Sequence, residues 1–462
     1  MTDAEPRPPH PIAGGATVAT IAEPTFADVN RDVLATLRPP GNLYFAWMCV
    51  VGLILTCGIL AWTYQIFFGM GAAGKRTPQM WAMYITTFVF WIGIGHAGTL
   101  ISAVLYLFRA RWRTSIYRAA EAMTIFAVLT AGLFPLIHAG RMWFAYFLLP
   151  YPNQRFLWPN FKSPLVWDVF AISTYLSIST VFFIVGLIPD VAAVRDGSTG
   201  WRRRLYGLLA LGWEGSDRQW RHYRRAYGLL AALATPLVLS VHSVVSWDFA
   251  MALVPGWHST LFAPFFVDGA ILSGFAMVLV LVLPMRFYFR LHAYITARHL
   301  DALAQLLLVT SLVLTYFYVC DAFTVWYSGD VFERSSLFWR LTGTYAPLVV
   351  TQYVCNSLVP LALFWGRARR SPLTLFVVSI LVLIGMWLER FNIIVPSLGH
   401  DFSPYTWGIF RPAIVDTTIT IGSFGFFFLL FLGFIRLMPS VSIAEVKETL
   451  PAPATAASRR AA

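Results

Sequence analysis

The feature that most constrains the fold is a succession of ten apolar runs along the chain, each long enough to cross a membrane. A transmembrane α-helix needs about 20 predominantly apolar residues. In lipid, every backbone N–H and C=O must be paired inside the protein, and a helix achieves this within one segment. The sequence therefore predicts an all-α integral membrane protein with ten transmembrane helices. The runs cover residues 43–68, 79–108, 118–149, 163–189, 225–252, 259–286, 302–328, 339–365, 372–394 and 414–437.

The composition excludes a soluble enzyme and a disordered or fibrous chain. Of the 462 residues, 58% are hydrophobic and 12% are charged, whereas a soluble domain carries about 25% charged residues. The net charge of +12 is typical of nucleic-acid-binding proteins, but cytoplasmic loops of membrane proteins are also rich in Lys and Arg. We therefore expect no nucleic-acid partner.

The cysteines predict no metal site, iron–sulfur cluster or covalently attached haem in this chain. All of them lie inside apolar runs and lack the spacing of a ligand or disulfide motif. They are Cys49, Cys57, Cys320 and Cys355.

The positive charges predict the orientation of the chain. Lys and Arg are concentrated in the loops after the second, fourth, sixth and eighth runs, and most densely between Arg202 and Arg225. Loops enriched in these residues stay in the cytoplasm, so both termini are expected on the cytoplasmic side. Residues 1–42 show no hydrophobic period and are predicted to be a cytosolic tail without a core. No signal peptide is expected before Leu43.

Runs two to five resemble runs six to nine, which predicts two parallel four-helix bundles flanked by runs one and ten. The matching pairs are Gly98-x-x-x-Ser102 with Gly269-x-x-x-Ser273, His138-Ala139-x-x-x-Trp143 with Asp321-Ala322-x-x-x-Trp326, Trp167-Asp168 with Trp339-Arg340, and Trp247-Asp248 with Trp387-Leu-Glu389-Arg390. The predicted parts are the N-terminal tail (1–42), the first helix and loop (43–78), the first bundle (79–252), the second bundle (253–394), a loop with the tenth helix (395–438) and a cytosolic C-terminal tail (439–462).

Ionisable residues near the outer ends of several runs form the main candidate site, because such groups are costly in a membrane and are usually functional. Arg141 is expected in a helix interior, one turn after His138 and on the same face. Asp168 opens run four, Asp248 lies in the outer half of run five, and Arg390 closes run nine. These groups suit the oxidation of a lipid-soluble hydroquinone, whose hydroxyl protons need a nearby acceptor. The alternative is a structural ion-pair network that joins Arg141 to Asp168 and Arg390 to Asp248.

Other polar signals inside the runs are interpreted more simply. Gly93-Ile-Gly95-His96-Ala-Gly98 matches a phosphate-binding pattern, but in mid-membrane it indicates close helix packing. His96 is either a polar relay or a hydrogen-bonded packing residue, and Asp268 is a candidate relay because no cap is needed at its position. A single haem between His138 and His242 remains an alternative.

Several motifs resemble the NrfD/polysulfide reductase family of membrane subunits, and more closely the C subunit of bacterial alternative complex III. The likeness spans residues 43–450. The motifs are Trp91-Ile-Gly-Ile-Gly-His-Ala-Gly-Thr-Leu-Ile-Ser-Ala103, Ile137-His-Ala-Gly-Arg-Met-Trp143, Ser163-Pro-Leu-Val-Trp-Asp-Val-Phe-Ala171, Pro255-Gly-Trp-His-Ser-Thr260 and Gly385-Met-Trp-Leu-Glu-Arg390.

The resemblance implies oxidation of menaquinol or ubiquinol near the periplasmic face of the bacterial inner membrane. Electrons would pass to a periplasmic iron–sulfur subunit and to multihaem cytochrome c subunits, beside a second NrfD-like membrane subunit. A terminal oxidase is a further candidate partner. By position, His138, Asp168, Asp248 and Arg390 match the quinol pocket, with His138 and Asp168 as proton acceptors, and Arg141 belongs to the same motif. A candidate proton path would run through His96, Asp268 and Asp321.

Two functions of other classes remain open on the sequence. The repeat and the intramembrane charges are also found in secondary transporters, although no pair of broken helices surrounds a polar midplane site. A passive membrane anchor that docks a periplasmic partner is the other alternative. Solute uptake by the isolated subunit would indicate the transporter, and absence of quinone binding would indicate the anchor.

Overall fold

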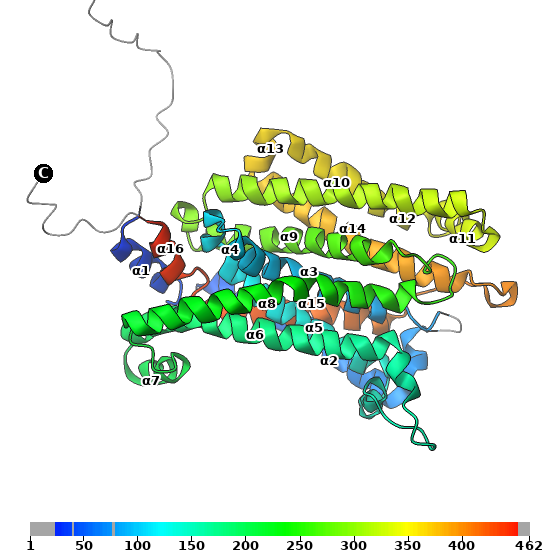
Figure 1. Cartoon of the computed structure of the whole chain (residues 1–462), viewed down its shortest axis with the longest axis horizontal. Helices are drawn as coiled ribbons and strands as arrows, with labels where there is room; N and C mark the ends of the chain where they lie inside the picture. Colours follow the sequence, from blue (N-terminus) through cyan, green and yellow to red (C-terminus); the bar gives the residue numbers. More distant parts are fainter. Residues whose placement is uncertain (1–23, 39–40, 76–78, 451–462) are drawn as a thin grey trace, which may run out of the picture.

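The computed structural model describes residues 24–38, 41–75 and 79–450, and all its regular elements are helical (Figure 1). Ten helical segments in these ranges are long and apolar enough to cross a membrane, which confirms the predicted class and number. They are α2 (Asn42–Phe68), α3 to α4 (Met83–Leu107), α5 (Tyr117–His138), α6 (Pro164–Asp196), α8 (Asp217–Ala250), α9 (Phe262–Tyr288), α10 (Ala297–Ser328), α12 to the turn η8 (Ala346–Phe364), α14 (Pro372–Gly399) and α15 (Ile414–Leu437).

Short helices lie outside these spans. They are α1 (Phe26–Ala35), α7 (Gly200–Leu209), α11 (Val331–Thr342), α13 (Gly366–Arg370) and α16 (Ile443–Thr449).

The buried centre of the molecule is formed by α3 and α9, which pack against each other. In the first group, α5 and α8 pack on α3, and α6 packs on α5 and α8. In the second group, α10 and α14 pack on α9, and α12 packs on α14. Figure 1 shows the second group above the first, while α2 pairs with α15 beside α5. The division into two parallel-repeat bundles of four helices with a flanking pair stays a prediction.

The glycines of α3 serve close helix packing, as the sequence predicted. A Cβ atom on Gly98 would overlap the carbonyl oxygen of Ala120 on α5, and one on Gly95 would lie 3.0 Å from the side chain of Val128. On the opposite side of α3, Ala97 leaves no room for a Cβ on Gly274 of α9. Small residues let backbones approach closely in a membrane, and here they bring both groups of helices onto α3.

The predicted end of run three is wrong, and this changes the position of Arg141. Helix α5 ends at His138, because Gly140 takes a left-handed conformation (φ +74°) of the kind that usually follows a helix end. Met142–Leu148 then form a separate 3₁₀ turn, η4. Arg141 is thus an exposed residue between the two elements and does not share a helical face with His138.

The predicted end of run nine is also wrong. Helix α14 continues to Gly399, so Arg390 lies inside the helix and is 2% exposed. The apolar stretch Phe391–Pro396 after Arg390 is itself buried and helical. The deeply buried arginine of the outer half is therefore Arg390 and not Arg141.

The expected start of run eight divides into two helices. Trp339 and Arg340 lie on α11, which Gly343 ends, and the span itself begins at α12. Within this span the turn Val354–Leu358 is a π-helix, as is Leu100–Val104 after α3. Such π-turns disturb the regular helix and frequently occur at functional sites.

Part of the predicted N-terminal tail is folded, contrary to the expectation that it lacks a core, and part of the predicted C-terminal tail is folded as well. Val29 and Val33 of α1 are fully buried, and α1 packs on α16. Residues 1–23 and 451–462 of the predicted tails lie outside the described ranges. The Asp190 carboxylate of α6 accepts hydrogen bonds from the backbone of Ile443 and Ala444, both at 3.0 Å, and thereby fixes the C-terminal segment to the first group of helices.

Candidate functional site

A cavity of about 820 Å³ opens between the first group of helices and η4. This volume is within the range of small-molecule sites. Its walls come from the ends of α5, α6 and α8 and from the aromatic turn Phe144–Leu149, with Trp81, Ile85 and Phe88 on the side of α3. The walls are mostly apolar, so the cavity suits a hydrophobic ligand that arrives from the lipid.

Three of the predicted site residues line this cavity together: His138, Asp168 and Asp248. They are the imidazole and the two carboxyl groups of the lining. His138 is the last residue of α5, Asp168 lies in the second turn of α6, and Asp248 lies two residues before the end of α8. Three helix ends therefore meet at one level and bring together residues that are far apart in the sequence.

The two carboxyl groups interact with each other, and the indole rings of the preceding residues, Trp167 and Trp247, lie 6.1 Å apart. Asp168 is 4% exposed. Both of its oxygens and Oδ1 of Asp248 have no hydrogen-bond partner in the described structure. Buried polar atoms without a partner are rare, so these oxygens are available to a ligand with hydroxyl groups.

His138 has a partner that the sequence did not indicate. The Nζ atom of Lys75 lies 2.8 Å from Nδ1 of His138, and Gln65 of α2 donates a 2.9 Å hydrogen bond to the carbonyl oxygen of the preceding residue, Ile137. Both residues stand close to a run boundary, where a single Lys or Gln is unremarkable in a sequence. Only their side-chain contacts show that they support the imidazole.

The two predicted arginines do not line the cavity. Arg390 forms an ion pair with its neighbour Glu389 at 2.8 Å and covers the ring of Phe266 on α9, 4.3 Å from the ring centre. Arg141 forms no ion pair in the described part of the chain, and Asp168 faces Asp248. The alternative ion-pair network, with Arg141 on Asp168 and Arg390 on Asp248, is therefore not formed.

His96 lies deeper in the first group of helices, in contact with His242. The two ring centres are 4.6 Å apart, and both side chains are buried. Nδ1 of His96 is bound to the carbonyl oxygen of Ile92 at 2.7 Å, whereas Nε2 of His96 and both nitrogens of His242 have no partner among the described residues. The two histidines of the alternative haem site thus have different neighbours. His138 contacts Lys75, and His242 contacts His96.

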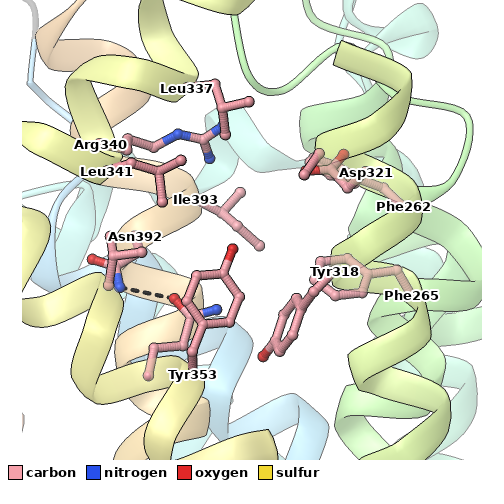
Figure 2. A pocket seen from close by; sticks show the side chains of 13 residues that line it. Phe262, Phe265, Tyr318, Asp321, Leu337, Arg340, Leu341, Tyr353, Asn392 and Ile393 are labelled. Atoms are coloured by element: carbon pink, nitrogen blue, oxygen red, sulfur yellow. Dashed lines mark hydrogen bonds between the residues drawn. The ribbon is translucent and has the colours of Figure 1, made fainter. Parts of the chain in front are cut away.

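Asp321 lies in a second, smaller cavity of about 40 Å³ in the other group of helices. Asp321 of α10 and Arg340 of α11 face each other across it, with Tyr353 and Asn392 on its floor (Figure 2). A cavity of this volume has room for a few water molecules. Its polar lining makes it a candidate place for ordered water.

Asp268, another residue of the predicted path, is half-buried on α9 and interacts with the charge of Glu389. The hydroxyl of Tyr318, which lines the cavity, donates a hydrogen bond to Oε2 of Glu389 and accepts one from Asn356 at 2.9 Å. Glu389 thus interacts with Asp268 and is bonded to Tyr318, which lines the same cavity as Asp321. The sequence could not reveal this because Tyr318 and Glu389 are on different helices.

Clusters of three or more His, Cys, Asp or Glu side chains suited to a metal ion do not occur among the described residues. The described structure is thus that of a multi-pass membrane protein with one large apolar cavity that contains acid–base groups.

The sequence matches the family described as polysulphide reductase, NrfD, over residues 71–399. Because this match covers most of the chain, the protein belongs to the NrfD family. The matched range includes the cavity residues His138, Asp168 and Asp248, as well as Lys75.

Three relatives are named as components of oxidoreductases. A protein of Halobacterium salinarum named for the membrane component C of dimethyl sulfoxide reductase is 26% identical over 89% of this chain and 94% of its own length. The integral membrane subunit of an Hdr-like menaquinol oxidoreductase of Archaeoglobus fulgidus is 21% identical over 88% and 96%. The C subunit of selenate reductase from Mesobacillus selenatarsenatis is 24% identical over 52% and 56%. The chain therefore belongs with integral membrane subunits of redox complexes.

Proposed function

We propose that this chain is the quinol-oxidising membrane subunit of a respiratory alternative complex III. The observation that carries the proposal is the apolar cavity with His138, Asp168 and Asp248 at its wall. Menaquinol and ubiquinol combine a lipid-soluble body with two hydroxyl groups, which matches an apolar cavity that contains a few proton acceptors. The menaquinol oxidoreductase relative from Archaeoglobus fulgidus supports the same substrate class.

The proposed chemistry removes two protons and two electrons from the hydroquinone. Oxidation makes the hydroxyl protons strongly acidic, and a base within reach accelerates their transfer. His138 accepts one proton and Asp168 accepts the other. Asp248 lies next to Asp168, and two negative charges so close together repel each other. The two carboxyl groups therefore share one proton more readily than both ionise. The protein supplies binding and proton acceptors, and the electron acceptor belongs to another subunit.

We assign the electron acceptor to a periplasmic iron–sulfur subunit that passes electrons to multihaem cytochrome c subunits. A second NrfD-like membrane subunit and a terminal oxidase complete the proposed set of partners. The cavity then opens near the outer face of the bacterial inner membrane, and both termini are cytoplasmic. The concentration of Lys and Arg between Arg202 and Arg225, at the opposite end of the helices, supports this orientation.

We further propose that protons move along the polar side chains of both helix groups. His96 and His242 form one part, next to Arg390, and Asp268, Glu389, Tyr318 and Asp321 form the other. Histidine and carboxyl side chains are the usual members of intramembrane proton relays. Arg390 therefore connects the two parts and has no role as a wall of the quinol cavity.

The test uses the native complex, purified in mild detergent through a tag on this subunit. A reduced quinol analogue is added, and the absorbance of haem c is followed. We expect rapid reduction in the wild type and a loss of at least about 100-fold in Asp168→Asn, because an amide of the same shape cannot accept the proton. The control is Asp330→Asn, which changes an exposed carboxylate that caps α11, since Asn caps a helix equally well.

Each other result contradicts a defined part of the proposal. Unchanged haem reduction in Asp168→Asn would remove the catalytic role of this cavity. If no haem c copurifies, the assignment to alternative complex III is wrong. Solute uptake by the isolated protein in liposomes would support a transporter, and failure of the isolated protein to bind a quinone analogue would support a passive anchor.

A further inference from the structure

The loop between α2 and α3 places one lysine directly behind the histidine of the cavity. Lys75 follows the 3₁₀ turn Met70–Ala73 and Gly74, which has φ +66°. A Cβ on Gly74 would lie 2.9 Å from the carbonyl oxygen of Arg411, so the loop is packed tightly against the segment before α15. The ammonium group is buried, 2.8 Å from Nδ1 of His138 and 4.5 Å from the ring centre of Tyr84.

The contact determines what the other nitrogen of His138 can do. A neutral imidazole has one nitrogen that donates and one that accepts. If Lys75 is an ammonium ion, it donates to Nδ1, and the ring proton must be on Nε2. If Lys75 is a neutral amine, Nδ1–H donates to Nζ, and Nε2 has a free lone pair. Since Nδ1 is occupied by Lys75, Nε2 is the nitrogen left for a ligand in the cavity.

We propose that Lys75 is a proton relay of the quinol site, which receives the proton of the hydroquinone through the imidazole of His138. The inference rests on the proposed function and extends it by one residue. The hydroquinone O–H bond breaks and its proton binds Nε2, while the proton on Nδ1 moves to Nζ of Lys75. The electrons leave to the iron–sulfur acceptor of the partner protein. The imidazole is neutral before and after the step, and only its tautomer changes.

Such a relay avoids a charged imidazolium ion in an apolar cavity, where an isolated charge is costly. The positive charge appears on Lys75, which does not line the cavity and interacts with the charge of Asp416. Asp416, in the first turn of α15, interacts with the charge of Lys75 and has one carboxylate oxygen, Oδ2, without a hydrogen-bond partner in the described structure. Asp416, which does not line the cavity, is therefore the onward acceptor in this proposal.

The surroundings of Lys75 also bring the pKa of its amine close to neutral pH. Burial lowers the pKa of Lys75 to about 7, and the charge of Asp416 acts in the opposite direction. The groups that face Lys75 are His138 from α5, Tyr84 from α3 and Asp416 from α15. Both protonation states of the amine are thus populated near neutral pH, as a relay requires.

The test compares Lys75→Met, Lys75→Arg and the wild type in the tagged complex, with quinol-driven haem c reduction measured from pH 5.5 to 9. The amine form of Lys75 accepts the proton, so kcat/KM of the wild type should rise as the pH increases through about 7. Both variants should lose this rise and react about 100-fold more slowly. Arginine keeps the charge and donors but does not deprotonate, so it should not restore the rate.

A matched control is Lys162→Met, which removes an exposed lysine from the loop before α6 and should leave the profile unchanged. Lys75→Gln, a shorter polar replacement, is used if the Met variant does not assemble. Near-normal turnover in Lys75→Arg would show that only the positive charge matters and would overturn the relay. A wild-type pH profile in Lys75→Met would overturn it as well. Absence of haem reduction by quinol in the wild type would instead refute the proposed function itself.

Discussion

The contact between α2 and α15 offers a sharp test of how helix packing supports the site. Gly58 of α2 meets Gly422 of α15 backbone to backbone. A Cβ on Gly58 would lie 2.7 Å from the Cα of Gly422, and the nearest ordinary contacts begin at 3.4 Å. Because the opposing atom is backbone, no side chain can move aside. Gly58→Ala therefore forces the two helices apart by ~0.7 Å.

The magnitude follows from two opposing effects. Overpacking of a close contact costs about 1–3 kcal/mol, while replacing Gly by Ala inside a helix contributes up to about 1 kcal/mol of stability. Gly52→Ala, on the same helix, gains the second effect alone, because a Cβ there meets nothing within 4 Å. We expect the two variants to differ by about 2 kcal/mol, with Gly58→Ala less stable than the wild type.

The same displacement should reach the cavity. Two turns after Gly58, the buried side chain of Gln65 donates to the carbonyl oxygen of Ile137, next to His138. Moving α2 away weakens this support of the imidazole, so quinol-driven haem reduction should fall in Gly58→Ala and remain normal in Gly52→Ala.

Both properties are measured on the tagged complex. Thermal stability is followed by size-exclusion chromatography after heating in detergent, where about 1 kcal/mol corresponds to about 2–4 °C. Midpoints for Gly58→Ala and Gly52→Ala that agree within one degree (about 0.5 kcal/mol or less) would refute the packing argument. A lower midpoint with unchanged turnover would refute only the connection through Gln65.

Three further predictions concern other parts of the molecule. Asp190→Asn should cost about 1.5–3 kcal/mol, because it neutralises one of the two carboxylates that pair with the buried Arg118 at 2.9 Å, while Glu121 remains. Faster proteolysis of the C-terminal segment tests this, and unchanged proteolysis would contradict it. Asp321→Asn should leave quinol-driven haem reduction and the two protons released per quinol intact, but should abolish proton release from proteoliposomes beyond those two protons. Equal release in the variant and the wild type would exclude Asp321 from the path. Phe147→Ser should raise KM for the quinol analogue about tenfold and leave kcat unchanged. The reason is that Phe147 lines the cavity, and burial of such a side chain contributes about 1.5–3 kcal/mol. An unchanged KM would mean that the quinol does not contact this wall.

The helix ends show where prediction from the sequence reached its limit. Hydrophobicity continues past His138 into Met142–Leu148, so the run gave no sign that α5 ends before Arg141. It also falls at Glu389 and Arg390, although α14 continues to Gly399. A charged pair can remain inside a helix when its two members form an ion pair and neighbouring helices contact them. Here these contacts come from Phe266 and Tyr318, elsewhere in the chain.

The candidate site was predictable in part, for the same reason. His138, Asp168 and Asp248 stood out because ionisable groups are costly inside a membrane and each lies near the outer end of a run. The structure brings all three to one cavity. Lys75 was not predicted, because it stands in a loop, where a lysine costs nothing unless the fold buries it.

The sequence by itself determined the class, the number of spans and the main acid–base groups, because these follow from apolar length and from the cost of charge in lipid. Only the tertiary structure decided that α3 and α9 form the centre, that Arg390 faces Phe266 and not the cavity, and that Lys75 touches His138. The physical reason is that such contacts join segments from different helices. The shapes of the side chains and the distance between the helix backbones determine these contacts. The pattern of hydrophobicity along the sequence contains neither kind of information.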